Sequence, residues 1–427
     1  MRYVTDSTWD RSTRDGSTLL AGSPLRVFRL SGAGSRVADD IEAGLDVHES
    51  KLVERLLDAG AIHPDHAGDV SRLSLHDVTI VTPQLGGDVV PGRDVTVDDG
   101  SRPPIESATI RLDTNRGPGA ARNAGRAAVE TELVAFVDAD VTLPGSSWLN
   151  DLLPHFDDPR VGLAAPRVVG DPASSLDLGS EPARVRSGSR VSYVPAAAIV
   201  VRVTAFDDVG GFDEMLRVGE DVDFVWRLDQ AGWGCRYEPR SVVHHEPRAT
   251  LSARLRQQVG YGTSAAPLAL RHPRALAPFR SNGWMAGGWA ACVLGHPALG
   301  GALAAANVAV VARALPEVPR ARLARLTLDA HVAGLRQLAA TIRRVWWPIA
   351  LVAAVLSKRA RWVTLAAVAL GPRSTHLDAA YGWGVWRGMI DHRSWRPIVP
   401  EISSWSPTPR QRRRAGERGQ RPAATGR

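Results

Sequence analysis

The sequence predicts an α/β protein in which a domain with a mostly parallel sheet follows a small α+β unit and precedes a helical, apolar region. The first observation is Leu133–Val137, five apolar residues that end at two aspartates, as is typical of a strand buried on both faces. The second is a glycine-rich stretch from Asn115 that leads into an alanine-rich helix. The third is a run of 29 residues, 284–312, without Lys, Arg, Asp or Glu.

The length of 427 residues gives room for two or three domains. We divide the chain into an N-terminal module at 1–75, the sheet domain at 76–270, a helical, membrane-associated region at 271–408 and a basic tail at 409–427 that is predicted to be disordered. Lys and Arg (52) exceed Asp and Glu (45) by a net charge of +7, and seven arginines fall in the tail. Because the excess charge is mostly in the tail, we expect no nucleic-acid partner for the folded body.

Cysteine usage and the N-terminus point to the cytosol. Cys235 and Cys292 lie in different segments and indicate no disulfide framework or metal cluster. The N-terminus has no charged-then-apolar signal pattern. We therefore expect a cytosolic start.

The N-terminal module is predicted as a β-hairpin over 19–30 followed by helices over 31–44 and 50–60. Ser50 is a good N-cap for the second helix, and Gly60 is a good stop. A unit of this size has little core of its own. Its pattern resembles the small winged-helix peptide-recognition domains of ribosomal-peptide maturation systems.

The sheet domain begins with two predicted strands, 78–83 and 95–101, and an unusual connection between them. The intervening residues 83–94 contain three glycines and Pro91 and show no helical pattern. A crossover between parallel strands needs about a dozen residues including its helix. No helix is therefore expected between these strands.

Two carboxylates, Asp138 and Asp140, follow the buried strand one residue apart. At the C-terminal edge of a parallel sheet they would place hard oxygen ligands where such sheets hold their ligands. The chemistry indicated is Mg²⁺ or Mn²⁺ shared with a diphosphate. The alternative is a solvated strand end. The glycine-rich helix start nearby would aim backbone N–H groups and Arg122 at an anion.

A predicted helix starts with three acids, Glu220, Asp221 and Asp223. They could simply stabilise the helix through its dipole and through Arg227 four residues after Asp223. The competing interpretation is that Asp221 projects into a cleft as a general base. An apolar strand then ends in the pair His244-His245, a candidate third metal ligand.

Five motifs together resemble the large inverting family-2 glycosyltransferases, and most of all those of mycofactocin systems. In chain order they are Asp98-Asp99-Gly-Ser, Asn115-x-Gly with Ala-Arg122-Asn123, Asp138-x-Asp140, Gly210-Gly-Phe-Asp213 and Gly219-Glu220-Asp221. The resemblance covers nearly the whole chain. It implies a nucleotide-diphosphosugar transferase fold (GT-A) with a mostly parallel sheet, a UDP-sugar donor and a divalent metal, Mn²⁺ or Mg²⁺.

The same resemblance assigns roles to single residues. The nucleotide-sugar would contact Asp98 or Asp99, Arg122 and Asp138, while the metal ligands would be Asp138, Asp140 and His245, which is favoured over His244. Asp221 would accept the proton of the acceptor hydroxyl, and the acceptor side would include Gly211, Glu220 and Arg256. One displacement would invert the anomeric configuration without an enzymic nucleophile.

The short connection at 83–94 is a departure from that family, whose members carry a helix between the first two strands. Its loss would weaken sugar-nucleotide binding and expose apolar sheet surface unless another segment covers the gap. The alternative outcome is an inactive member that acts as a peptide-binding module.

The region after residue 270 is predicted to associate with the cytosolic face of the membrane. The run 284–312 exceeds the roughly 20 residues that span a bilayer. A spanning helix, an interfacial hairpin and a buried hairpin are all compatible with its Ala/Gly-rich composition. Tryptophans and arginines around the shorter apolar runs 345–356 and 362–370 favour an interfacial position.

The predicted function is metal-dependent transfer of a sugar, with glucose as the expected sugar, from a UDP-sugar to a peptide-derived acceptor. By the resemblance, that acceptor is the redox cofactor mycofactocin or its precursor. A lipid or polysaccharide acceptor is the alternative that the apolar C-terminal region would suit.

Overall fold

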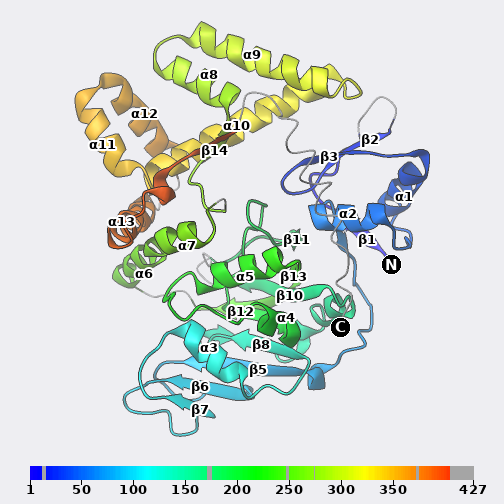
Figure 1. The fold of residues 1–427 in the computed structure, drawn as a ribbon, viewed down its shortest axis with the longest axis vertical. Helices are drawn as coiled ribbons and strands as arrows, with labels where there is room; N and C mark the ends of the chain where they lie inside the picture. The colour runs from blue at the N-terminus through cyan, green and yellow to red at the C-terminus, as the bar shows by residue number, and fades with distance from the viewer. Residues whose placement is uncertain (12–15, 171–175, 247–249, 274, 372–374, 404–427) are drawn as a thin grey trace, which may run out of the picture. The chain divides into compact units, whose positions relative to one another are not determined.

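A computed structural model gives the fold of the chain and describes residues 1–11, 16–170, 176–246, 250–273, 275–371 and 375–403 (Figure 1). The predicted basic tail, 409–427, lies outside these residues. The chain forms two compact units. The first comprises Met1–Leu276 and Gly384–Ser394, and the second comprises Ala277–Trp383 and Trp395–Arg427. Each unit is described separately below.

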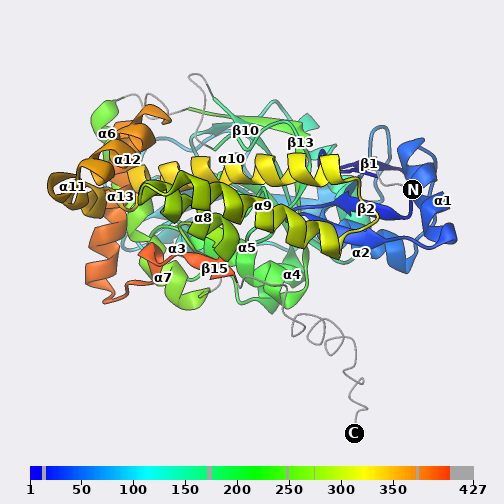
Figure 2. The same ribbon diagram turned by 90° about the horizontal axis from the view of Figure 1, so that it is seen from above.

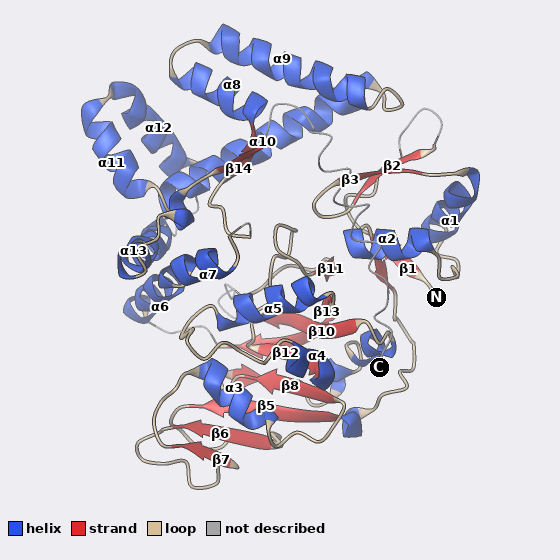
Figure 3. Cartoon of the chain, in the orientation of Figure 1, coloured by secondary structure: helices blue, strands red, loops and turns tan. Residues whose placement is uncertain are grey.

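The main sheet of the first unit is mostly parallel, as predicted (Figure 3). Strands β7, β6, β5 and β8 run parallel, β12 is antiparallel to both of its neighbours, and β10 and β13 are parallel. In sheet order the strands are β11 (Ala183–Arg184), β13 (Gly234–His245), β10 (Val161–Val169), β12 (Ala198–Arg202), β8 (Leu133–Val137), β5 (Val78–Gln84), β6 (Val95–Asp99) and β7 (Ile110–Leu112), with β9 (Val141–Thr142) paired to β13.

Helices cover one face of this sheet and short 3-10 turns cover the other. Side chains from α3 (Pro118–Arg126), α4 (Val203–Asp208) and α5 (Glu220–Ala231) share one apolar core with the sheet. The turns η2 (Ser147–Leu149) and η3 (Leu153–Asp157) contribute to a second core on the opposite face. Every residue of β8 is buried. The prediction of a strand buried on both faces is therefore confirmed.

The connection between β5 and β6 contains no helix, as the sequence predicts. Gln84 holds the turn by donating to the carbonyls of Gly86 (3.0 Å) and Asp88 (2.6 Å). Asp94 accepts the amide of Ile80 (2.7 Å), and Arg93 donates to the carbonyl of Val141 (2.8 Å). A hydrogen-bonded loop therefore takes the place of the helix, and α3 packs against both strands.

The N-terminal module contains the predicted hairpin, β2 (Thr18–Ala21) with β3 (Arg26–Arg29), and the two predicted helices, α1 (Gly32–Glu42) and α2 (Lys51–Ala59). Ser50 caps α2 by accepting the amide of Val53, and Gly60 ends it with φ +64°. A second antiparallel pair joins β1 (Tyr3–Thr5) to β4 (Ile62–Pro64). The module thus has two separate two-stranded sheets around its own core.

The second unit is helical. Figure 2 shows α8, α9 and α10 lying side by side, and these helices contact one another. Its elements are β14 (Arg280–Asn282), α8 (Gly283–Val293), α9 (Pro297–Ala314), α10 (Arg320–Arg344), α11 (Trp347–Leu356), α12 (Lys358–Ala369), η4 (Arg396–Ile398) and β15 (Glu401–Ser403), with β14 paired to β15. The uncharged run 284–312 therefore forms a helical hairpin rather than one continuous helix.

One described helix, α9, is long and apolar enough to cross a membrane, and only 11% of its apolar window is buried. The helices α10 and α11 pass the same test only as a pair bent by 91°. Large apolar side chains elsewhere in this unit are also exposed, including Val355 (79%) and Leu356 (81%).

The first unit is discontinuous in sequence. Helices α6 (Leu251–Thr263) and α7 (Ala265–Arg271) follow the sheet, and the second half of α13 (Thr375–Asp391) returns to pack on α6. Gly384 lies against the backbone of Val259, and Gly388 against that of Thr263. A Cβ atom at either glycine would collide with a carbonyl oxygen, so glycine permits this close approach.

Candidate active site

Arg122 lies at the centre of the site. It projects from α3 and is only 2% exposed. Its guanidinium donates to Glu220 (2.9 Å) and Asp138 (2.7 Å) and also to the carbonyl of Ala196 (3.3 Å), and it lies over the ring of Phe212. Although burial opposes its charge, the two carboxylates raise the pKa of Arg122. One cation thus joins the end of β8 to the start of α5.

The start of α5 presents two acids with different contacts. Glu220 is buried and paired with Arg122, whereas Asp221 is half-buried and accepts the amide of Val222 (2.8 Å). Burial raises the pKa of Asp221. Burial, together with the charge of Asp221, raises the pKa of Glu220. A carboxyl with a raised pKa at a sheet edge is suited to exchange protons near neutral pH.

The third acid of this helix, Asp223, has a structural role. Its carboxylate contacts His272 (2.8 Å) and accepts from Arg227 (2.7 Å). The stabilising interpretation of the acidic helix start is therefore correct for Asp223. It does not account for Asp221, whose carboxylate accepts the Val222 amide.

Asp138 and Asp140 lie just beyond β8 in a turn closed by the Val141 amide and the Asp138 carbonyl (3.1 Å). Asp138 pairs with Arg122, and burial raises its pKa. The exposed Asp140 lies 3.4 Å from Nε2 of His245, at the end of β13. His244 is exposed. Asp140 and His245, which are far apart in the sequence, thus lie side by side.

Asp140 and His245 are candidate ligands for the predicted metal ion. Among the described residues, no group of three or more His, Cys, Asp or Glu side chains is placed to hold a metal ion. The oxygen of Asp140 suits Mn²⁺ or Mg²⁺, whereas the nitrogen of His245 suits a transition ion such as Mn²⁺ better than Mg²⁺. Asp138 already has Arg122 as its cation, so Asp140 and His245 are the pair best suited to a metal.

Asp98 and Asp99, predicted to contact the nucleotide-sugar, are both buried and both bind the backbone. Asp98 accepts the amides of Ser101 (2.8 Å) and Ile105 (3.1 Å). Asp99 accepts the amides of Arg116 (2.7 Å) and Gly117 (2.8 Å). These contacts fix the loop after β6 and the glycine-rich turn before α3, so both aspartates shape the walls of the site.

The three residues predicted on the acceptor side have different contacts in the structure. Gly211 has φ +69° and sits against Asn123 and Phe206, where a Cβ atom would clash. Its carbonyl accepts from Arg227 (2.7 Å). Arg256 is exposed on α6. Gly211 therefore has a conformational role and Glu220 belongs to the Arg122 cluster, while contact of these residues with an acceptor stays a prediction.

Two further contacts of the site were not predicted from the sequence. Asn123 donates to the Phe212 carbonyl and accepts the Phe212 amide, both at 2.9 Å. The carbonyl of Ala196 reaches Arg122. The motif containing Asn123 hinted at its importance, but nothing in the sequence marks a backbone carbonyl as a ligand.

Comparison with known proteins decides the family. The model for glycosyl transferase family 2 matches residues 95–184. The pre-mycofactocin glycosyltransferase of Mycobacterium tuberculosis (strain ATCC 25618 / H37Rv) is 38% identical over 461 residues, covering 92% of this chain and 97% of that protein. The chain belongs to glycosyltransferase family 2. This family-2 enzyme is also 33% identical to the succinoglycan biosynthesis protein ExoA of Rhizobium meliloti (strain 1021) over 117 residues. That alignment covers 23% of this chain and 36% of ExoA.

Solved structures similar to the family-2 enzyme include a mannosyltransferase and S. aureus TarS. The mannosyltransferase PcManGT from Pyrobaculum calidifontis, in complex with GDP-Man and Mn²⁺, covers 73% of this chain and 87% of its own, with 17% identity and a TM-score of 0.35. S. aureus TarS 1-349 in complex with UDP-GlcNAc covers 46% and 67%, with 18% identity and a TM-score of 0.37.

Proposed function

We propose that this glycosyltransferase moves a hexose, with glucose as the expected sugar, from a UDP-sugar to the peptide-derived precursor of mycofactocin. The observation that carries this proposal is the 38% identity to the pre-mycofactocin glycosyltransferase over 97% of that protein. The mostly parallel sheet and the site at its edge support a nucleotide-diphosphosugar transferase fold of the GT-A type for the catalytic domain. The N-terminal module, by its size and pattern, is proposed to be a winged-helix-like unit.

The proposed reaction is a single displacement. Asp221 accepts the proton of the acceptor hydroxyl as the oxygen attacks the anomeric carbon, and the bond to the diphosphate breaks with its electron pair leaving on UDP. Attack from the face opposite the leaving group inverts the anomeric configuration. Arg122 holds Glu220 and Asp138 in fixed positions around the site, so little reorganisation is required during transfer.

A divalent metal is proposed as the cofactor, with Asp140 and His245 as its ligands and Asp138 nearby. When bound, such an ion offsets the negative charge that builds on the departing diphosphate. The 3.4 Å contact between Asp140 and His245 supports this assignment, since it brings an oxygen and a nitrogen donor together.

Calorimetric titration of UDP-glucose into the full chain tests the donor and the metal together. We expect binding with Mn²⁺ and at least about tenfold weaker binding with chelator, because an ion held by Asp140 and His245 would offset the charge of the diphosphate. The Asp140→Asn variant should lose the same metal dependence.

The same titration distinguishes an active enzyme from an inactive member of the family. Binding would show that the hydrogen-bonded loop at 85–94 leaves the nucleotide pocket intact. If UDP-glucose binds neither with Mn²⁺ nor with chelator, the proposed donor is wrong and the inactive alternative gains support.

The second unit is proposed to hold the enzyme at the cytosolic face of the membrane. Its support is the apolar helix α9 and the exposed apolar side chains of α11 and α12, such as Val355, Leu356 and Trp362. Membrane-interface helices commonly combine such side chains with flanking arginines. A lipid-linked acceptor would suit the same location and is the second candidate function.

Substitution on α11 tests membrane association directly. Val355→Asp with Leu356→Asp is expected to reduce cosedimentation with anionic lipid vesicles at least about threefold, because charge opposes burial of this surface in lipid. Truncation is a poorer test, since it would remove residues 384–394 from the first unit.

The matched control is Leu25→Asp, which adds a charge at an exposed leucine in the hairpin of the N-terminal module. It should leave vesicle binding unchanged. Equal vesicle binding by the α11 variant and the wild type would contradict the proposed role of this surface.

A further inference from the structure

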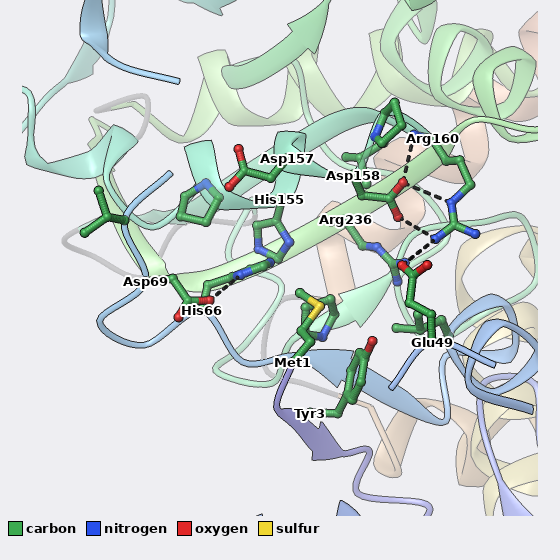
Figure 4. Close-up of a pocket in the computed structure, with 16 residues that line it drawn as sticks. Met1, Tyr3, Glu49, His66, Asp69, His155, Asp157, Asp158, Arg160 and Arg236 are labelled. Carbon is green, nitrogen blue, oxygen red and sulfur yellow. Dashed lines mark hydrogen bonds and ion pairs between the residues drawn. The ribbon is translucent and has the colours of Figure 1, made fainter. Parts of the chain in front are cut away.

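A pocket of about 490 Å³ lies between the N-terminal module and the sheet domain (Figure 4), and none of its lining residues belongs to the candidate active site. The module contributes Tyr3, Leu57 and Pro64 to its lining, and the sheet domain contributes Pro154 and Arg236. Both belong to the first compact unit. A volume of this size is typical of a small-molecule site.

Arg236 is unusual among the residues that line this pocket. It lies on β13 and is only 7% exposed. Within the described structure, its Nε and Nη1 atoms have no hydrogen-bond partner. Burial lowers the pKa of Arg236 to about 10. The charges of Asp158 and Asp58 oppose this shift, but two buried nitrogens of the guanidinium have no hydrogen-bond acceptor among the described residues. Buried donors without an acceptor are costly, so they point to a ligand.

A neighbouring arginine, Arg184, has hydrogen-bond acceptors for its guanidinium. Arg184 lies opposite Arg236 in the strand register. Its guanidinium donates to Asp229 (2.7 Å) and to the carbonyls of Val185 (2.9 Å), Cys235 (3.2 Å) and Trp233 (3.1 Å). The missing partners of Arg236 are therefore not a general property of this sheet edge.

The carboxylates around the pocket already have partners of their own. Asp158 accepts from Arg160 (2.9 Å), and the side chain of Asp69 contacts His66 (3.1 Å). Two further acids also have partners: Asp157 accepts from Ser71 (2.9 Å), and Glu49 lies 3.8 Å from Arg160.

We propose that this pocket binds a small organic carboxylate, whose charged group pairs with Arg236 and whose apolar body packs on the ring and proline walls. A guanidinium fork matches a carboxylate with two parallel hydrogen bonds. The apolar lining from Tyr3, Leu57 and Pro64 favours an organic acid over a free inorganic anion.

The site is separate from sugar transfer. Arg236 and His244 pair with Ala164 and Val169 of the neighbouring strand, five residues apart, which corresponds to about 17 Å along the sheet. The ligand would thus contact the N-terminal module while the reaction proceeds at the other end of β13. The inference does not depend on the identity of the sugar or the acceptor.

Calorimetry on the full chain tests the inference with three probes. N-acetyl-L-phenylalanine should bind, whereas its amide, which lacks only the charge, should bind at least about tenfold more weakly. Inorganic phosphate should bind more weakly than the acid. The inference is overturned if the amide binds as well as the acid, or if phosphate binds and the acid does not.

Two pairs of variants assign the binding to Arg236. Arg236→Met keeps the length without the charge and should weaken acid binding at least about tenfold. Arg236→Lys should also weaken it, since lysine cannot form the bidentate pair, whereas Arg160→Lys in the same pocket should change the affinity less than about threefold. Unchanged binding by Arg236→Met would contradict the assignment. If that variant does not fold, the comparison of acid with amide in the wild type decides alone.

Discussion

Replacing Asp221 with asparagine is expected to lower kcat for sugar transfer about a thousandfold, because an amide cannot accept the proton of the acceptor hydroxyl. Asparagine has nearly the same size and still accepts the amide of Val222, which Asp221 contacts at 2.8 Å. The affinity for UDP-sugar should therefore change less than about threefold. Steady-state kinetics and donor titration measure the two effects separately.

The control is Asp207→Asn, which removes a charge from an exposed ion pair with Arg126 on the same domain. It should keep nearly full activity.

In the wild type, the raised pKa of Asp221 places the acidic limb of the rate profile above the ordinary aspartate range. Activity should be present above that pKa and should fall as pH falls through it. Loss of UDP-sugar binding in Asp221→Asn would remove Asp221 from its proposed role.

Replacing Arg122 with methionine is expected to lower the free energy of unfolding by about 3–5 kcal/mol, because Glu220 and Asp138 would lose their shared cation inside the protein. Urea denaturation monitored by tryptophan fluorescence measures this change. Transfer activity should fall as well, since the acids around the site would no longer be held in place.

The matched control is Arg126→Met, one turn further along α3. Arg126 pairs with the exposed Asp207, so its loss should cost only about 1 kcal/mol or less. A second variant, Arg122→Met with Glu220→Gln, should recover part of the stability, because Asp138 would then be the one carboxylate of the pair left without its cation. An equal cost for Arg122→Met and Arg126→Met would contradict the central position of Arg122.

The elements that the sequence predicts well are those with a local physical cause. The strand Leu133–Val137 is uniformly apolar, and the helix after Ser50 has both a cap and a glycine stop. The connection at 83–94 is too short for a helix, and the structure contains none there. In each case the deciding residues lie within a few positions of the element.

The parts that could not be predicted depend on contacts between distant segments. No local pattern shows that Ala198–Arg202 runs antiparallel between β8 and β10. The aspartates Asp138 and Asp140, predicted to act together at the sheet edge, lie in a turn with different partners. One pairs with Arg122 and the other lies beside His245, and those partners are fixed by the folded sheet.

The return of α13 to α6 has a consequence for synthesis on the ribosome. Gly384 and Gly388, which allow that contact, are made more than a hundred residues after Thr263. At a synthesis rate of about 5–20 residues per second, the packing partner of α6 is made at least several seconds after α6 itself. The helices of the second unit are made during that interval, so their apolar surfaces are exposed before the catalytic unit is complete.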